Sequence, residues 1–259
     1  MTLLCLDVRN SSTTIGLFDG DELLDTWRVS TDARRTADEW GLLITGLVER
    51  TQLLKHLDGA CVSSTVPSVR HEVRTMLAAR RFHLHTVVVG PGVKSGLSVL
   101  MDNPREVGTD RVANAVAAAA LVGGPCIVVD FETATTFDVI DAAGRYVGGA
   151  IAPGIEMSVT ALGERGAQLR QVELDRPRSV IAKNTVEALQ SGAVFGFAAQ
   201  VEGIVARMVA ELDLDVDDIE VVATGHLGSA VIEECRVFTR HEPSLTLDGL
   251  RLIYERNPR

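Results

Sequence analysis

Two loops in this sequence combine an aspartate with several hydroxyl residues, and each directly follows an apolar run. The first reads DVRNSSTT over 7–14, and the second reads DFETATT over 130–136. A buried strand that ends in aspartate places a carboxylate at the edge of a sheet, where the following hydroxyl and N–H groups can hold phosphate oxygens. Two such loops facing each other would bind a nucleotide.

Each aspartate also has a simpler interpretation, in which it only caps a turn, because Asx and Ser/Thr turns are common between strands. The same pattern recurs at the start of both halves of the chain, on the same arrangement of predicted strands. This repetition favours the phosphate-binding interpretation.

A third acidic candidate, Asp110, stands in the sequence GTDR at 108–111, just before an apolar helical run. Phosphoryl transfer requires mainly positioning and charge neutralisation, so one carboxylate beside an acceptor hydroxyl is a sufficient general base. The alternative is that Asp110 only caps the helix and favours its first turn. Taken alone, the residue pattern ranks the cap first.

The elements that must position these residues repeat along the chain. The first half predicts strands over 3–8, 13–18 and 22–29, a helix over 36–50, a strand over 60–64, a helix from 67 to about 81, and a strand over 86–89. The second half predicts strands over 127–130, 135–140 and 145–150, then helices, a strand over 220–223, a helix, a short strand near Val237 and a helix over 247–255. We therefore expect an internally duplicated α/β protein with lobes 1–112 and 113–259.

Composition restricts the class of protein. The chain has 259 residues, 46% of them hydrophobic and 23% charged, which predicts a folded protein. A net charge of −10 without a basic cluster argues against nucleic-acid binding. The apolar start of the chain reaches Asp7 too early to form a signal-peptide core. The apolar run 112–129 contains Asn114 and is interrupted at 123–125, so we expect no membrane span there. Together these features predict a cytoplasmic location. The four widely spaced cysteines predict reduced, buried thiols.

Six motifs, in order over residues 4–257, resemble those of the type III pantothenate kinases of the actin-like ATPase superfamily. They are DVRNS at 7–11 (family D-x-G-N-T), GTDR at 108–111 (G-x-D-R), DFETATT at 130–136 (D-F-G-T-A-T-T), GGAIAPG at 148–154, KNT at 183–185 and LTLDGLRLIYERN at 245–257. The resemblance implies two tandem RNase H-like lobes with a nucleotide cleft between them. It also implies ATP-dependent phosphorylation of pantothenate to 4'-phosphopantothenate, the first step of coenzyme A biosynthesis.

The same resemblance assigns roles on the pantothenate side. Asp110 is the general base for the primary hydroxyl, and Arg111 pairs with the pantothenate carboxylate, which suits a forked, permanently charged donor. Gly108 and Thr109 complete the substrate loop, and Thr185 contacts pantothenate near a homodimer interface. The residues alone leave a simpler interpretation open for each position: Arg111 is a solvated charge on a helix, and Thr185 caps a helix.

On the nucleotide side, the resemblance implies that Asp130 ligates a monovalent cation, K⁺ or NH₄⁺, while Mg²⁺ accompanies ATP. A cation there would reduce repulsion between the carboxylates and the triphosphate. The residues expected to bind ATP are Asp7, Val8, Arg9, Asn10, Ser11, Ser12, Thr13, Thr14 and Thr133.

Five positions depart from the family motifs, and two of these are small changes: Ser11 for threonine, which keeps a hydroxyl, and Ala182 for the glycine before Lys183. Glu132 replaces a glycine beside the expected phosphates, where it adds bulk and negative charge. Arg9 replaces a glycine at the equivalent point of the first loop, and we hypothesise a salt bridge between Arg9 and Glu132; the alternative is two solvated side chains. His226, which replaces a second glycine in A-T-G-G, is interpreted as a packing or hydrogen-bonding residue. Two other functions stay open: a catalytically impaired paralogue with a ligand-binding or regulatory role, and a kinase of another small alcohol.

Overall fold

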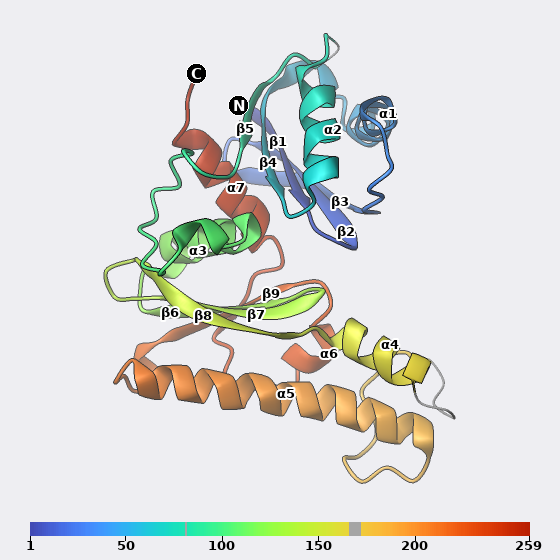
Figure 1. Ribbon diagram of the computed structural model, residues 1–259, viewed down its shortest axis with the longest axis vertical. Helices are drawn as coiled ribbons and strands as arrows, with labels where there is room; N and C mark the ends of the chain where they lie inside the picture. Colours follow the sequence, from blue (N-terminus) through green and yellow to red (C-terminus); the bar gives the residue numbers. More distant parts are fainter. Residues whose placement is uncertain (81, 166–171) are drawn as a thin grey trace. The chain divides into compact units, whose positions relative to one another are not determined.

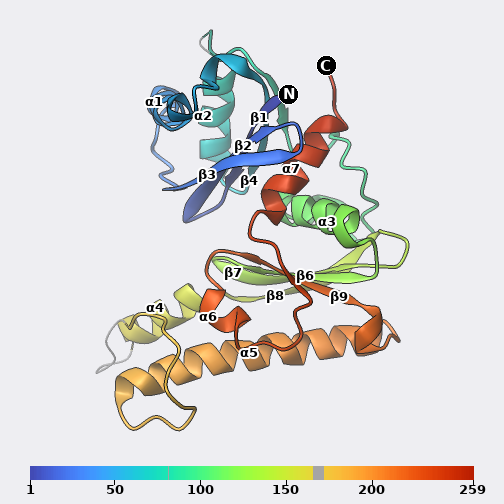
Figure 2. The ribbon, with the colours of Figure 1, turned by 180° about the vertical axis from the view of Figure 1, so that it is seen from behind.

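The computed structural model describes residues 1–80, 82–165 and 172–259. The chain divides into two compact units (Figures 1 and 2). The first unit contains Met1–Ala117 together with Leu245–Arg259, and the second contains Ala118–Ser244. Each unit is built around one five-stranded sheet.

The sheet of the first unit has the strand order β3-β2-β1-β4-β5. Its strands are β1 (Thr2–Val8), β2 (Ser12–Asp19), β3 (Glu22–Ser30), β4 (Leu57–Ser64) and β5 (His85–Val88). The first three form an antiparallel meander, whereas β4 and β5 lie parallel to β1 and β4 respectively. Strand β1 is central and buried along its whole length, so the residue at its carboxyl end, Asp7, is buried as well.

Helices cover both faces of this first sheet. On one face, α1 (Ala37–Val48) and α2 (Pro67–Ala78) pack their apolar sides against β1, β2 and β4. On the other face, α3 (Thr109–Val122) and α7 (Leu245–Glu255) pack on alternate residues of the same strands (Figure 1). A capping box between Thr36 and Glu39 fixes the start of α1.

The second sheet has the order β10-β9-β6-β7-β8, which reproduces the topology of the first. Its strands are β6 (Cys126–Phe131), β7 (Ala134–Ile140), β8 (Tyr146–Pro153), β9 (Glu220–Gly225) and β10 (Arg240–His241). The unit also contains α4 (Ile155–Arg165), α5 (Thr185–Glu211) and α6 (Ser229–Ile232). Short 3-10 turns elsewhere in the chain span Glu49–Thr51, Leu54–His56, Pro104–Glu106 and Val216–Asp218.

Helix α5 covers one face of the second sheet. Its buried residues recur at helical spacing and pack on the side chains of β6, β7 and β9. They include Val194, Ala198, Val201, Val205 and Val209. Within the described part of the chain, α5 is also the one helix long and apolar enough to cross a membrane, but a third of its most apolar window is buried and the core helix of a soluble protein meets the same criteria. It is therefore weak evidence for a membrane span.

These observations confirm the expected fold class, with two α/β units and a repeated strand order. The unit boundaries differ from the predicted lobes, because residues 113–117 and 245–259 belong to the first unit. The physical reason is the apolar side of α7, where Leu247, Leu250 and Ile253 pack with Leu3 and Cys5 of β1. The last strand lies at Arg240–His241 instead of near Val237, and α2 ends at Ala78; Arg81, its predicted end, lies outside the described residues.

All four cysteines are free, as predicted, and Cys5, Cys61 and Cys126 are buried; the prediction of burial is wrong for Cys235, which is only half-buried. Burial raises the pKa of the Cys126 and Cys235 thiols to about 12. These thiols are therefore protonated at neutral pH and are poor nucleophiles.

Candidate active site

A row of three oxygen-bearing side chains crosses the carboxyl end of β1 in the first unit. Asp7 is paired in register with Thr14 of β2 on one side and with Ser63 of β4 on the other. Asp7 is only 2% exposed and Ser63 is fully buried. Ser63 Oγ lies 2.8 Å from Thr109 Oγ1, which ties the row to the start of α3.

Arg9 belongs to a buried hydrogen-bond chain in the same unit. Its Nε donates to Asp7 Oδ2 at 2.5 Å, and its Nη2 donates to Thr246 Oγ1 at 2.9 Å. Thr246 Oγ1 in turn donates to Asn114 Oδ1 at 2.6 Å. The arginine that replaces a motif glycine therefore compensates the Asp7 carboxylate and connects the loop with α3 and α7.

Most of the other side chains of the first loop are either buried in the core or exposed at its tip. Val8 and Thr13 are buried, and Thr13 Oγ1 lies 2.8 Å from Thr31 Oγ1, so their side chains do not lie with Asp7. Asn10 and Ser11 are exposed at the tip of the turn. The structure therefore brings Asp7, Arg9 and Thr14 of the predicted ATP-binding set to one edge, and leaves the other side chains of the loop on the tip or in the core.

Asp110 lies in the first turn of α3, beside this edge. It is the acidic residue of that first turn, as the helix-start interpretation expects, and its half-buried side chain makes no hydrogen bond or ion pair with the described residues. A Cβ atom on Gly108 would come within 2.5 Å of Asp110 Oδ1, so glycine leaves the space that this carboxylate occupies. Thr109 and Arg111 flank it, both half-buried.

A cavity of about 510 Å³ lies next to this helix start within the first unit, large enough for a small organic ligand. Thr109 and Val112 of α3 line it, together with Arg70 of α2, Arg105, and the glycines Gly90 and Gly92. The two guanidinium groups give the cavity a positive wall, which suits a carboxylate-bearing ligand. Arg111, the predicted carboxylate partner, is not among the residues that line it.

The second unit contains an equivalent row at the carboxyl end of β6. Asp130 is paired in register with Thr136 of β7 and with Thr224 of β9, in the arrangement of Thr14, Asp7 and Ser63. Asp130 is 2% exposed and Thr224 is 1% exposed. The Thr224 hydroxyl has no hydrogen-bond partner among the described residues, so it offers an oxygen ligand beside Asp130.

The loop after β6 is held tightly by two glycines. A Cβ atom on Gly154 would come within 2.2 Å of Thr133 O, and one on Gly225 within 2.4 Å of Phe131 O. Gly225 also has a φ of +87°, which other residues rarely adopt. Gly154 N donates to Thr133 O at 3.2 Å, so the backbone around Glu132 and Thr133 is fixed by close contacts on both sides.

Glu132 and His226 form a pair on this loop. His226 Nδ1 lies 2.6 Å from Glu132 Oε1, and the two side chains are 25% and 11% exposed. This contact confirms the interpretation of His226 as a hydrogen-bonding residue. The hypothesised pairing of Arg9 with Glu132, which involves both units, stays a prediction.

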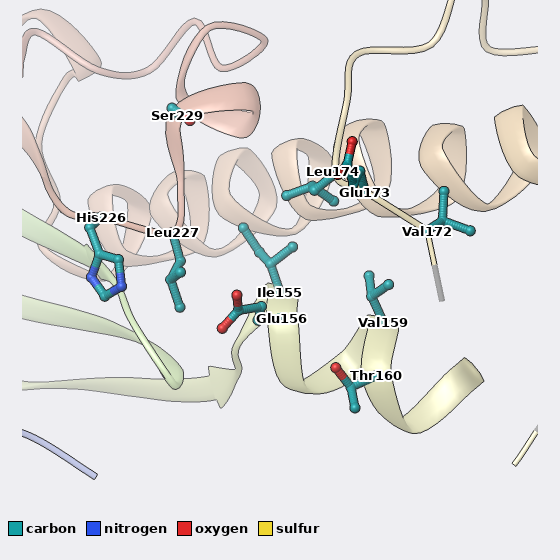
Figure 3. Close-up of a pocket in the computed structure, with 10 residues that line it drawn as sticks. All are labelled: Ile155, Glu156, Val159, Thr160, Val172, Glu173, Leu174, His226, Leu227 and Ser229. Carbon is teal, nitrogen blue, oxygen red and sulfur yellow. The ribbon is translucent and has the colours of Figure 1, made fainter. Parts of the chain in front are cut away.

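A second cavity, of about 520 Å³, lies within the second unit beside His226. Figure 3 shows His226 and Leu227 at one end, on the loop after β9, with Ser229 on α6. Residues Ile155, Glu156, Val159 and Thr160 of α4 and the segment Val172–Leu174 form the other walls. Its walls combine apolar side chains with polar ones, and the carboxylates Glu156 and Glu173 disfavour phosphate, so the cavity suits an uncharged ring or sugar.

Comparisons with known proteins identify the family. Residues 3–207 match the sequence profile of type III pantothenate kinase. A type III pantothenate kinase of Nocardioides sp. is 60% identical over 99% of this chain and all of its own length. The chain belongs to the type III pantothenate kinase family. The enzymes of that name from Streptomyces avermitilis and Thermobifida fusca are 58% and 57% identical, each over 98% of this chain and at least 98% of their own length.

Solved structures support the fold of this pantothenate kinase family member. A conserved putative Baf family transcriptional activator from Campylobacter jejuni has a TM-score of 0.61 at 18% identity, with 98% of both chains covered. The activator of the 2-hydroxyisocaproyl-CoA dehydratase from Clostridium difficile, with bound ADPNP, has a TM-score of 0.57 at 11% identity, over 99% of this chain and 96% of its own. At these identities the likeness establishes the fold alone.

Thr185, the remaining predicted pantothenate contact, is exposed at the first position of α5. The capping interpretation of this residue is wrong, because the N-cap is Asn184, whose Oδ1 accepts the N–H of Glu187 at 2.9 Å. The Thr185 side chain is thus not required to cap the helix. It lies on the surface of the second unit.

The sequence motifs assign no role to Ser63, Thr224, Thr246 or Asn114, although Thr224 and Thr246 lie within motifs. A signal for two of them exists in the duplication, since Ser63 and Thr224 end equivalent strands, β4 and β9. Asn114 is a polar residue inside an apolar helical run, which indicates a buried hydrogen bond. Nothing local marks Thr246 as a partner of Arg9.

Proposed function

We propose that this chain transfers the γ-phosphoryl group of ATP to the primary hydroxyl of pantothenate and so forms 4'-phosphopantothenate and ADP, the first step of coenzyme A biosynthesis. The observation that carries the proposal is the state of the Asp110 carboxylate, which is half-buried and makes no hydrogen bond with the described residues. It lies beside the Asp7 row, in a chain that has the motifs of the family. A carboxylate in this state can accept the hydroxyl proton as the oxygen attacks phosphorus.

The pantothenate side is proposed to use the cavity next to α3. Thr109 lines it and Asp110 follows directly, so the acceptor hydroxyl belongs near these two residues, with Gly108 leaving the space for the base. Arg70 and Arg105 supply positive charge for the pantothenate carboxylate, in addition to the predicted Arg111.

ATP is proposed to bind with a divalent metal, as kinases generally require, and with the loops 7–14 and 132–133 around its phosphates. The residues near Asp130 also fit a monovalent cation, because the row offers only oxygen ligands: the Asp130 carboxylate and the hydroxyls of Thr136 and Thr224. Such a cation would neutralise Asp130 near the phosphates. The described residues contain no group of three or more His, Cys, Asp or Glu that could hold a metal ion, so a cation here would depend on hydroxyl and carbonyl oxygens.

A cytoplasmic homodimer is proposed as the working form. Three apolar side chains on either side of Thr185 are exposed: Val180 by 66%, Ile181 by 85% and Val186 by 47%. A cluster of exposed apolar side chains is typical of a protein interface. A second copy on this surface would bring Thr185 into a site formed with the partner, in agreement with its predicted contact to pantothenate.

The test is ADP release in the presence of pantothenate, Mg²⁺ and K⁺, measured for the native chain and for Glu132→Gly. Turnover by the native chain that depends on pantothenate supports the kinase. Turnover by the variant alone selects the impaired paralogue. If both folded proteins bind ATP but do not turn over pantothenate, the outcome points to another acceptor alcohol or to chemistry lost elsewhere in the chain.

A further inference from the structure

Two residues that replace motif glycines, Glu132 and His226, face each other in this structure. Phe131 and Gly225 are the last registered pair between the parallel strands β6 and β9. Glu132 and His226 are the next residues on each strand, and Leu227 N donates to Phe131 O at 3.1 Å just beyond them. The sheet register therefore places the two substituted positions side by side, although 94 positions separate them in the sequence.

The contact between the two side chains has a defined direction. A carboxylate only accepts hydrogen bonds, so His226 Nδ1 carries the proton and donates to Glu132 Oε1 at 2.6 Å. Glu132 is 11% exposed, and a carboxylate that is so little exposed would be costly without a donor. The bond also draws the carboxylate toward β9, whereas Thr133, the predicted phosphate contact, continues toward β7.

We propose that His226 is a positioning residue for the nucleotide: it holds Glu132 toward β9 and offsets its negative charge, so that the loop 132–133 accepts phosphate without the motif glycines. The inference rests on the proposed ATP site. The ring of His226 also lines the cavity in Figure 3, so it connects the phosphate loop with the neighbouring site for an uncharged group. The two substitutions act as one unit, because each side chain alone would disturb the loop that the pair preserves.

The experiment is a double-mutant cycle on ATP affinity, measured by calorimetry with Mg·ATP for the native chain, Glu132→Gly, His226→Ala and the double variant. We expect His226→Ala to weaken ATP binding at least about tenfold, because the hydrogen bond that holds Glu132 toward β9 is then lost beside the phosphates. The double variant should bind within about threefold of the native chain, since the carboxylate that His226 holds is gone as well. His241→Ala, which removes an exposed imidazole from β10 of the same unit, is the matched control.

A kinetic readout separates positioning from a general loss of structure. In the pantothenate kinase assay, His226→Ala should raise the KM for ATP while the KM for pantothenate stays unchanged, and Glu132→Gly in the same chain should reverse the effect. Equal weakening in His226→Ala and in the double variant would overturn the proposal, because the histidine would then act independently of Glu132. Native affinity in His226→Ala would overturn it too. Absence of ATP binding in all four folded proteins would instead refute the proposed kinase function on which the inference rests.

Discussion

Asp7 and Asp130 occupy equivalent places in two separate sheets, each nearly buried and flanked by hydroxyl residues on the neighbouring strands. Their surroundings differ in charge. Arg9 binds Asp7 directly, whereas the residue equivalent to Arg9 in the second loop is Glu132, which is bound by His226. The first aspartate is thus already compensated by a cation of its own unit.

Asp110 gives the first prediction. Asp110→Asn keeps the size of the side chain at the start of α3 but removes its ability to accept a proton, so kcat should fall about 10²- to 10⁴-fold. The measurement is steady-state ADP release with pantothenate as the variable substrate. ATP affinity by calorimetry and the circular dichroism spectrum should match those of the native chain. Retention of more than about a tenth of the native kcat would refute the role of Asp110 as general base.

Among the elements, α7 illustrates how a helix distant in sequence completes the first unit. It packs on β1, β4 and α3, and its first turn supplies Thr246 to the buried chain that holds Arg9. The close approach of α7 to α3 requires a glycine, because a Cβ atom on Gly249 would come within 2.0 Å of Ala113 O. The nearest atoms belong to the backbone of Ala113, so a rotation of side chains cannot relieve the contact.

Gly249→Ala should therefore push α7 away from α3 and lower the free energy of unfolding by about 1–3 kcal/mol. Urea denaturation, followed by circular dichroism, measures this change. Gly46→Ala in α1 is the control, since no atom lies within 4 Å of the Cβ position there, and alanine in a helix should be neutral or stabilise by up to about 1 kcal/mol. Equal unfolding free energies for Gly249→Ala and the native chain would contradict the close contact.

At the scale of the whole molecule, the exposed apolar residues around Thr185 connect assembly with function. A single copy would leave Val180 and Ile181 in water beside a residue predicted to contact substrate. Burial of these side chains by a second copy would remove apolar surface from water and stabilise the assembly. Dimerisation would then be required for a complete pantothenate site.

Ile181→Glu should convert the proposed dimer into a monomer and raise the KM for pantothenate, because a charge at this position opposes burial. Light scattering coupled to size-exclusion chromatography measures the mass, and the kinase assay measures the KM. Val216→Glu is the matched control: Val216 is 62% exposed and follows the other end of α5, a helix of 27 residues and thus about 40 Å long. A monomeric native chain, or a dimeric Ile181→Glu, would contradict the proposed interface.

The sequence by itself determined the family, the α/β class, the repeated strand order and the aspartates at the strand ends. These features are readable because they depend on local composition: apolar runs of strand length, turn residues and short motifs whose residues are neighbours in the chain. Cys5, Cys61 and Cys126 follow the same logic, since the apolar runs that contain them in the sequence are buried strands in the fold.

Only the tertiary structure decided which residues compensate Asp7 and Glu132 and where the last helix belongs. The cause is sheet register and helix docking, which bring Glu132 to His226 and Arg9 to Thr246 across 94 and 237 positions. No local pattern encodes such pairs, because each depends on how strands and helices from distant segments align. For the same reason, α7 is recognisable as a helix in the sequence, but the unit that it completes follows from the packing of its apolar side.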